Sequence, residues 1–232
     1  MRMINAIIGK QLKDTFKNKE VLIQFIMFPL LAIIMNTAIH IEGMPDNFFV
    51  CLFGVMYVGM APLTSMAAII AEEKEKNTLR VLMLSNVTPL QYLIGIGGYI
   101  WCICMLGASI FCVTGKYTGI DAVRFMGIMA VGILVSILYG AAIGVGSKNQ
   151  MAATSVTVPV MMIFSFLPML SMFNDTIKQI ARLTYSQQVN LLLYQLETDF
   201  EVTFENVSVM ILNIIIALII FIKKLKITNF IH

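Results

Sequence analysis

The densest group of ionisable side chains in this chain is the stretch Glu72-Glu73-Lys74-Glu75-Lys76-Asn77-Thr78-Leu79-Arg80. Glu72 and Lys76 stand four residues apart, in the order that favours an ion pair on a helix. Two long runs without Asp, Glu, Lys or Arg, 47–71 and 81–115, flank this charged segment. Charges this dense cannot lie in hydrocarbon. We therefore expect a short connection in water, held to a membrane at both ends and well placed to receive force from another protein.

No other group of residues has the types and spacing of a catalytic or metal site. The H-E-x-x-H and G-x-S-x-G motifs and paired carboxylates are absent, and Gly95-Ile96-Gly97-Gly98 lacks the Gly-Lys-Ser/Thr ending of a phosphate-binding loop. His40 and His232 are far apart in sequence, and the four cysteines lie inside apolar runs without a C-x-x-C pair. We expect no catalytic, cofactor-binding or metal-binding residue, so that the chain is not an enzyme and any active transport takes its energy from a partner.

The composition is that of an integral membrane protein. Hydrophobic residues make up 59% of the 232 residues and charged residues only 12%, whereas a soluble domain has about 25% charged residues. The net charge of +3 is small, and no basic stripe with interleaved aromatic residues occurs. Nucleic acid is therefore excluded as a partner.

Six apolar runs are long enough to cross a bilayer as helices. They do not alternate in polarity, as the strands of a membrane barrel do, and helices are the other way to satisfy the backbone in lipid. We predict an all-α integral membrane fold with a six-span transmembrane domain over 21–232. The spans are expected at about 21–39, 48–70, 89–114, 123–146, 151–173 and 206–222.

The distribution of Lys and Arg predicts the orientation. With the N-terminus inside, 12 of the 16 basic residues lie on the inner side, and the outer side holds only Lys116, Arg124, Lys178 and Arg182. We therefore expect both termini and the charged segment in the cytoplasm. A bacterial cell membrane is the expected location.

Residues 1–20 are too polar for a span, but their apolar residues recur at helical spacing. This pattern predicts an amphipathic helix lying in the inner membrane interface. A signal peptide is the rival interpretation, but its charged region would be far shorter and no convincing A-x-A site follows. The apolar face comprises Ile4, Ile7, Ile8, Leu12 and Phe16.

The segment 174–205 predicts two short amphipathic helices on the outer side, because Val189, Leu192, Leu193 and Leu196 follow helical spacing. Both helices are too short to span the membrane. They either enter the membrane from outside or lie flat on it, and the sequence leaves this open.

The predicted spans hold polar residues but no ionisable residue in their interior. This absence argues against proton- or sodium-coupled transport, which uses ionisable residues at mid-membrane. The polar side chains form hydrogen bonds between helices or line a substrate path. Gly140 and Gly144 form a G-x-x-x-G pair that favours close helix packing, either inside the subunit or at a dimer interface.

Local signals mark where the charged segment ends and where the next apolar run begins. Asn77 tolerates a left-handed turn, and Pro89 suits the first turn of a helix. The pattern predicts a loop over 72–88 with a short cytoplasmic helix, a bend and re-entry into the membrane. The competing interpretation is a solvated connector whose Lys and Arg residues only reflect the usual excess of positive charge in inner loops.

From Glu73 to Gly95 the sequence resembles the corresponding loop of type-2 ABC exporter permeases. That family has a Glu-rich stretch, Gly-Thr-Leu, Leu-rich residues, a small-residue turn and an apolar stretch ending in Gly-Lys. The chain departs from the pattern at Asn77, where Gly is usual, and at Ile96, where Lys is usual. The matching positions are Glu73, Glu75, Thr78, Leu79, Leu82, Ser85 and Gly95.

The resemblance implies a transport subunit without its own ATPase. Two such subunits form one pathway, as a homodimer or a heterodimer, and each docks on a cytoplasmic ABC ATPase that binds ATP and Mg. The docking elements would be the N-terminal interfacial helix and the loop after span two, called the coupling helix. The coupling residues implied here are Glu73, Glu75, Asn77, Thr78, Leu79 and Arg80.

The expected function is export of an amphipathic or apolar substrate, such as a peptide, an antibiotic or a lipid. Two alternatives remain. A passive channel would transport without nucleotide, and a membrane immunity or scaffold protein would protect the cell even beside an inactive ATPase.

Overall fold

The computed structural model describes residues 19–39, 43, 45, 47–78, 88–196, 198 and 200–227. The interfacial helix predicted over 1–20 lies outside these residues, apart from the two with which the first described helix begins. Residues 79–87 of the predicted coupling loop also lie outside them.

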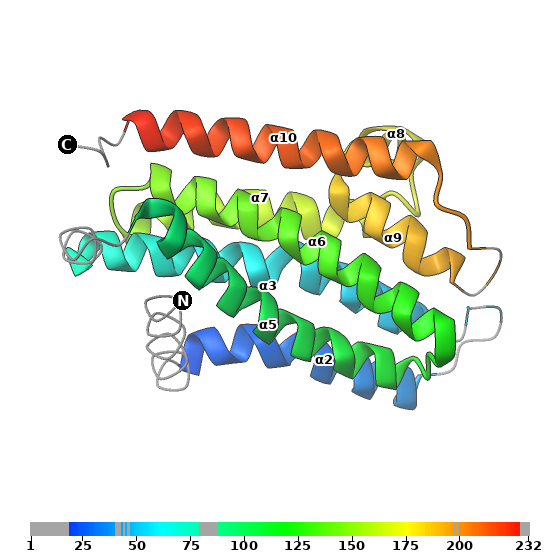
Figure 1. Cartoon of the computed structure of the whole chain (residues 1–232). Coiled ribbons are helices and arrows are strands. Elements are labelled where there is room, and N and C mark those ends of the chain that lie inside the picture. Colours follow the sequence, from blue (N-terminus) through cyan, green and yellow to red (C-terminus); the bar gives the residue numbers. More distant parts are fainter. Residues whose placement is uncertain are drawn as a thin grey trace.

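The described part of the chain is all-helical and has no strand, so the predicted all-α character is confirmed. The long helices run side by side along one bundle (Figure 1). At one end, here called the charged end, α3, α6 and α10 finish while α5 and α7 begin. The helices are α2 (Lys19–Ala38), α3 (Phe48–Glu75), α5 (Pro89–Thr114), α6 (Gly119–Gly146), α7 (Gln150–Leu170), α8 (Asp175–Ala181), α9 (Tyr185–Gln195) and α10 (Phe204–Ile227).

Five helices in the described ranges are long and apolar enough to cross a membrane: α3, α5, α6, α7 and α10. The apolar part of α2, Phe25–Ala38, is shorter than each of these five helices. The multi-pass character is therefore confirmed, whereas the sixth span stays a prediction.

Three helices extend beyond the apolar runs that predicted them. Helix α3 continues through Glu75, so the predicted loop at 72–88 starts inside a helix. Helix α6 begins at Gly119, because Asp121 and Arg124 pair across one turn at 3.0 Å and keep the polar end helical. Helix α10 covers Phe204–Ile227 and includes the lysines after its apolar run. Hydropathy identifies the apolar part of a helix but does not show where its polar ends lie.

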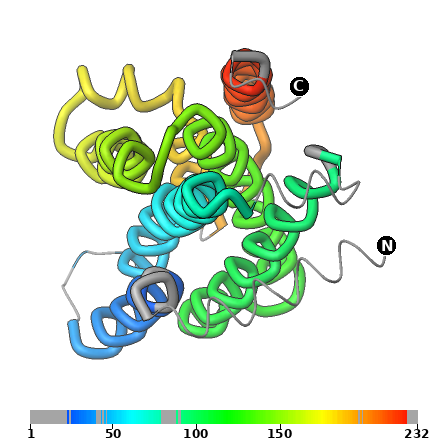
Figure 2. Tube along the Cα trace, turned by 90° about the vertical axis from the view of Figure 1, so that its left-hand side faces the viewer, coloured from blue at the N-terminus to red at the C-terminus, as the bar shows by residue number. Residues whose placement is uncertain are grey.

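Helix α3 lies at the centre of the bundle, with α10 and α2 on opposite sides of it (Figure 2). It contacts α2, α5, α6, α7 and α9. The most apolar windows of α3 and α6 are both 67% buried, against 22% for α7 and 28% for α10. Large apolar side chains therefore cover the outer faces of α7 and α10, as expected for surfaces that meet lipid.

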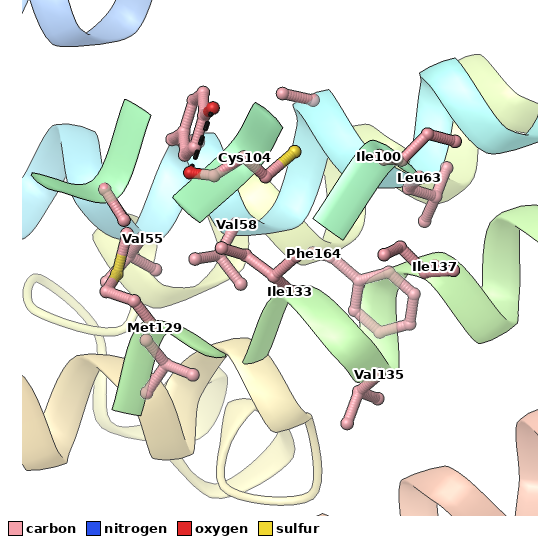
Figure 3. Packing of buried hydrophobic residues seen from close by; sticks show 14 of the residues in the cluster. Val55, Val58, Leu63, Ile100, Cys104, Met129, Ile133, Val135, Ile137 and Phe164 are labelled. Atoms are coloured by element: carbon pink, nitrogen blue, oxygen red, sulfur yellow. Dashed lines mark hydrogen bonds between the residues drawn. The ribbon is translucent and has the colours of Figure 1, made fainter. Parts of the chain in front are cut away.

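Side chains from α3, α5, α6 and α7 meet in the middle of the bundle (Figure 3). Val58 and Leu63 of α3 are fully buried there, as is Ile133 of α6. The hydroxyl of Tyr57 donates to the carbonyl of Cys104 on α5 at 3.4 Å. Cys104 thus lies in the core, whereas Cys102 of the same helix is exposed.

Two glycines of α6 let that helix approach α3 closely. A Cβ atom on Gly140 would overlap the carbonyl oxygen of Leu63 and lie 2.9 Å from the Cβ of Met66. A Cβ atom on Gly144 would lie 2.8 Å from the Cβ of Ile70. Small residues at this spacing allow two helices to come into backbone contact.

A proline in α3 creates a polar link to two other helices. Pro62 has no N–H, so the carbonyl of Val58, four residues earlier, lacks its usual helical donor. Ser136 of α6 donates to this carbonyl at 2.6 Å. Its hydroxyl also lies 2.9 Å from the hydroxyl of Tyr185 on α9. Because the serine proton is already used, Tyr185 is the donor, and burial raises the pKa of its hydroxyl and keeps it protonated.

Helix α9 packs inside the bundle against α3, α6, α7 and α10, whereas α8 is largely exposed and contacts α7. Residues 185–190 are all buried, although the helix is polar. Gln188 donates to the carbonyl of Arg182 at 2.6 Å and accepts from Asn206 of α10 at 2.7 Å. Asn213 of α10 donates to the carbonyl of Leu183 at 2.9 Å. Side-chain amides thus satisfy backbone carbonyls of the turn between α8 and α9 inside the protein.

We expect Gly140→Val to lower the thermal stability of the protein in detergent, because the added carbons collide with the backbone of α3. Overpacking of this kind costs about 1–3 kcal/mol. The matched control is Gly127→Val in the same helix, where an added Cβ meets nothing within 4 Å. Equal melting temperatures for the two variants would contradict the close contact.

Candidate functional site

The candidate site is the last turn of α3, where the charged segment begins. Successive residues of a helix point about 100° apart, since there are 3.6 residues per turn. Glu73, Lys74 and Glu75 therefore face three directions. Each of them bonds to a different neighbouring element.

Glu73 faces the inside of the bundle and is only 6% exposed. Its carboxylate accepts a hydrogen bond from the hydroxyl of Tyr92 on α5, which is itself buried. A buried carboxylate without a donor would be costly, so this bond fixes the end of α3 against α5.

The start of α5 positions Tyr92. Thr88 caps the helix, because its side chain accepts from the backbone N–H of Gln91 at 3.3 Å. The side chain of Gln91 accepts in return from the backbone N–H of Thr88 at 3.1 Å, and Pro89 occupies the first turn. This capping box fixes where α5 begins and so places Tyr92 one turn inside it.

Lys74 binds the end of α6. Its ammonium donates to the carbonyl of Val145 at 2.7 Å and to the carbonyl of Ser147 at 2.5 Å. The last carbonyls of a helix have no partner within the helix, and the helix dipole makes this end negative. The ammonium of Lys74 supplies hydrogen-bond donors to these carbonyls and places a positive charge at the negative end of the dipole.

Glu75 binds the start of α7. Its carboxylate accepts from the backbone N–H of Gln150, the first residue of that helix, at 2.9 Å. The side chain of Asn149 caps the same helix by accepting from Ala152 at 2.8 Å. A negative charge at a helix N-terminus is the favourable arrangement.

The remaining described residues of the segment face outward, apart from the half-buried Thr78. Lys76 and Glu72 form the predicted i,i+4 ion pair on the exposed side of the helix. Asn77 has φ 56°, so the prediction of a left-handed turn at this residue is confirmed, and it ends the helix.

Four of the six predicted coupling residues, Glu73, Glu75, Asn77 and Thr78, fall within the described ranges and form one continuous turn. Leu79 and Arg80 lie outside them. Glu73 and Glu75 are engaged within the chain, which the interpretation as a solvated connector does not account for. Gly140 and Gly144 lie apart from this turn, along the α3–α6 contact.

Three further residues of this site, Lys74, Tyr92 and Gln150, could not be identified from the residue pattern alone. Tyr92 stands next to the capping sequence Thr88-Pro89-Leu90-Gln91, and a phenol one turn inside a span is a signal for a buried acceptor. Lys74 looked like an ordinary inner-side charge, and a backbone N–H such as that of Gln150 leaves no signal in the sequence.

The arrangement connects the end of α3 mechanically to its neighbours. Within the described residues, no group of three His, Cys, Asp or Glu side chains could hold a metal ion. One helical turn instead joins the end of α3 to α5, α6 and α7.

A family model described as "ABC-2 family transporter protein" matches residues 42–223 of the chain. This range includes α3, the charged segment and most of α10. No curated protein sequence matches the chain.

We expect Tyr92→Phe to lower the thermal stability in detergent by the equivalent of about 1–3 kcal/mol, because it leaves the Glu73 carboxylate buried without this donor. Glu73→Gln should cost less, since its amide oxygen can still accept. The control is Tyr92→Phe in a Glu73→Leu background, where no carboxylate needs a donor. An equal loss in both backgrounds would show that the hydrogen bond contributes nothing.

Proposed function

The chain belongs to the ABC-2 transporter family, and we propose that it is the permease subunit of an ATP-driven exporter. Family membership makes it a multi-pass membrane transport subunit and implies association with an ABC ATPase. The outward direction of transport and the type of substrate are our proposals.

The observation that carries the proposal is the set of three hydrogen-bonded contacts made by Glu73, Lys74 and Glu75. We propose that the segment 72–88 is the coupling element and docks in a groove of the ATPase. Closure of the ATPase would then move the end of α3, and the contacts would carry this movement to α5, α6 and α7 together.

In this proposal the six coupling residues divide into two groups. Glu73 and Glu75 hold the segment to the bundle, whereas Asn77, Thr78, Leu79 and Arg80 contact the ATPase. Both termini then lie in the cytoplasm, where the interfacial helix over 1–20 provides a second docking surface. ATP and Mg bind to the ATPase.

The proposed substrate is amphipathic or apolar: a peptide, an antibiotic or a lipid. The interior of the predicted spans has no ionisable residue that would bind a strongly charged solute, and 18 methionines and 15 phenylalanines offer adaptable apolar contacts. A second permease subunit, identical or similar, would complete the pathway in the membrane of a bacterial cell.

We expect Leu79→Asp to reduce both co-purification of the ATPase and substrate-stimulated ATP hydrolysis. Burying a leucine side chain contributes roughly 1.5–3 kcal/mol, so a carboxylate in its place should cost a tenfold or greater loss of complex. The comparison is Lys76→Gln, which removes an exposed ion pair worth about 0–1 kcal/mol. Both variants should reach the membrane in normal amounts. Full activity and complex recovery for Leu79→Asp would leave the segment without a coupling role.

The orientation can be tested with single cysteines at Asp175 and Lys148, in a variant whose four native cysteines are replaced. Both positions are exposed, Asp175 on α8 and Lys148 in the turn between α6 and α7. We expect a membrane-impermeant maleimide to label position 175 in intact cells and position 148 only after permeabilisation. The reverse pattern would overturn the proposed topology.

A further inference from the structure

Helix α8 stands on the outside of the bundle, just after the end of α7 that lies away from the charged end (Figure 1). Its main contact is with α7. In Figure 2 the segment that carries it (yellow) projects beyond the outline of the other helices. Of its seven residues, only Ala181 is buried. The rest of its surface is therefore turned towards the surroundings of the bundle.

The exposed apolar surface of α7 continues onto α8. Helix α7 is long and apolar enough to cross a membrane, so its exposed side chains meet lipid. Leu170 in the last turn of α7 is 46% exposed, Phe173 in the following turn is 77% exposed, and Ile180 of α8 is 60% exposed. Because these side chains follow directly from a lipid-facing helix, the surroundings of α8 are the membrane at the level where α7 ends.

Helix α8 has a basic side and an apolar side. Ile180 stands two residues from both Lys178 and Arg182, and two residues of a helix turn through about 200°. The two cations therefore share one side, one turn apart, and Ile180 lies nearly opposite them. Leu183 follows Ile180 by three residues, lies on the apolar side and is 64% exposed.

The two cations of α8 are available to a ligand. Lys178 and Arg182 are exposed, and neither side chain is paired with a carboxylate among the described residues. Opposed basic and apolar sides are typical of a helix that lies in the plane of the membrane interface.

We propose that α8 lies flat in the membrane interface, where Lys178 and Arg182 bind the phosphates of phospholipids. Phe173, Ile180 and Leu183 insert among the acyl chains beneath these phosphates. Of the two positions that the sequence leaves open for this segment, α8 takes the flat one, whereas α9 packs inside the protein. The inference depends on neither the substrate nor the direction of transport.

Arg182 connects the lipid surface to α9. Its side chain is exposed on the basic side of α8, while its backbone carbonyl accepts from the buried side chain of Gln188 at 2.6 Å. Phosphates that hold the side chain of Arg182 therefore also hold the turn from which α9 enters the bundle.

Spin labels on single cysteines test this position of α8. The full-length variant without native cysteines would carry the label at position 180 or at position 175, in vesicles of phosphatidylcholine and phosphatidylglycerol. Collisions are measured with oxygen, which concentrates in lipid, and with a water-soluble nickel chelate. We expect the label at 180 to collide mainly with oxygen and to lie roughly 5–10 Å below the phosphates. The matched control is the exposed position of Asp175 on the basic side, where the chelate should dominate.

Two outcomes of the labelling would overturn the proposal. Equal access of the chelate to both labels would place α8 in water. Slow collisions of the label at 180 with both reagents would show that protein, such as a second copy of the chain, covers the apolar side.

The contacts with phosphate are tested by Lys178→Gln combined with Arg182→Gln. We expect the ratio of released to inserted α8 to rise by roughly fivefold for each cation removed. The label at 180 would then collide more often with the chelate. Lys116→Gln, which removes an exposed cation from the turn between α5 and α6, should leave the collision rate unchanged. The same collision rate in the double variant as in its parent would contradict the binding of phosphate.

Discussion

The contact between α3 and α6 is the interaction on which the rest of this bundle depends. Lipid tails are as apolar as leucine side chains, so burial of apolar surface does not drive membrane helices together. Close packing and hydrogen bonds must do so, and both need the backbones to approach. Gly140 and Gly144 permit that approach. With α6 in place, α3 provides the central surface on which α2, α5, α7 and α9 pack.

Much of this fold could be predicted from the sequence, because membrane constraints are visible in composition. A run of about 20 apolar residues must be helical, since lipid offers the backbone no hydrogen-bond partner. The bounds of α5 matched the prediction, because Thr88, Pro89 and Gln91 are local signals that act within four residues. The turn at Asn77 is local in the same sense.

The partners at the end of α3 could not be predicted, because they depend on which helices stand around it. Glu73, Lys74 and Glu75 look alike in sequence as charges beside a membrane. Their partners Tyr92, Val145 and Gln150 are 19, 71 and 75 residues away, and two of the acceptors or donors are backbone groups. The sequence also could not show that α9 packs inside the protein. Buried side-chain amides are stable only where neighbouring backbone groups form hydrogen bonds with them, and those neighbours depend on the fold. Local patterns therefore predict elements, whereas the site arises from their packing.

The proline of α3 has a consequence for how the two halves of the chain are aligned. The carbonyl of Val58 is available to Ser136 because residue 62 has no N–H, and Tyr185 reaches that carbonyl only through the same serine. The carbonyl of Val58 thus helps to fix the position of α9 along α3. With any other residue type at position 62, a backbone N–H would share the carbonyl of Val58 with Ser136. Pro62 therefore influences where α9 packs on α3, although α3 and α9 are far apart in the sequence.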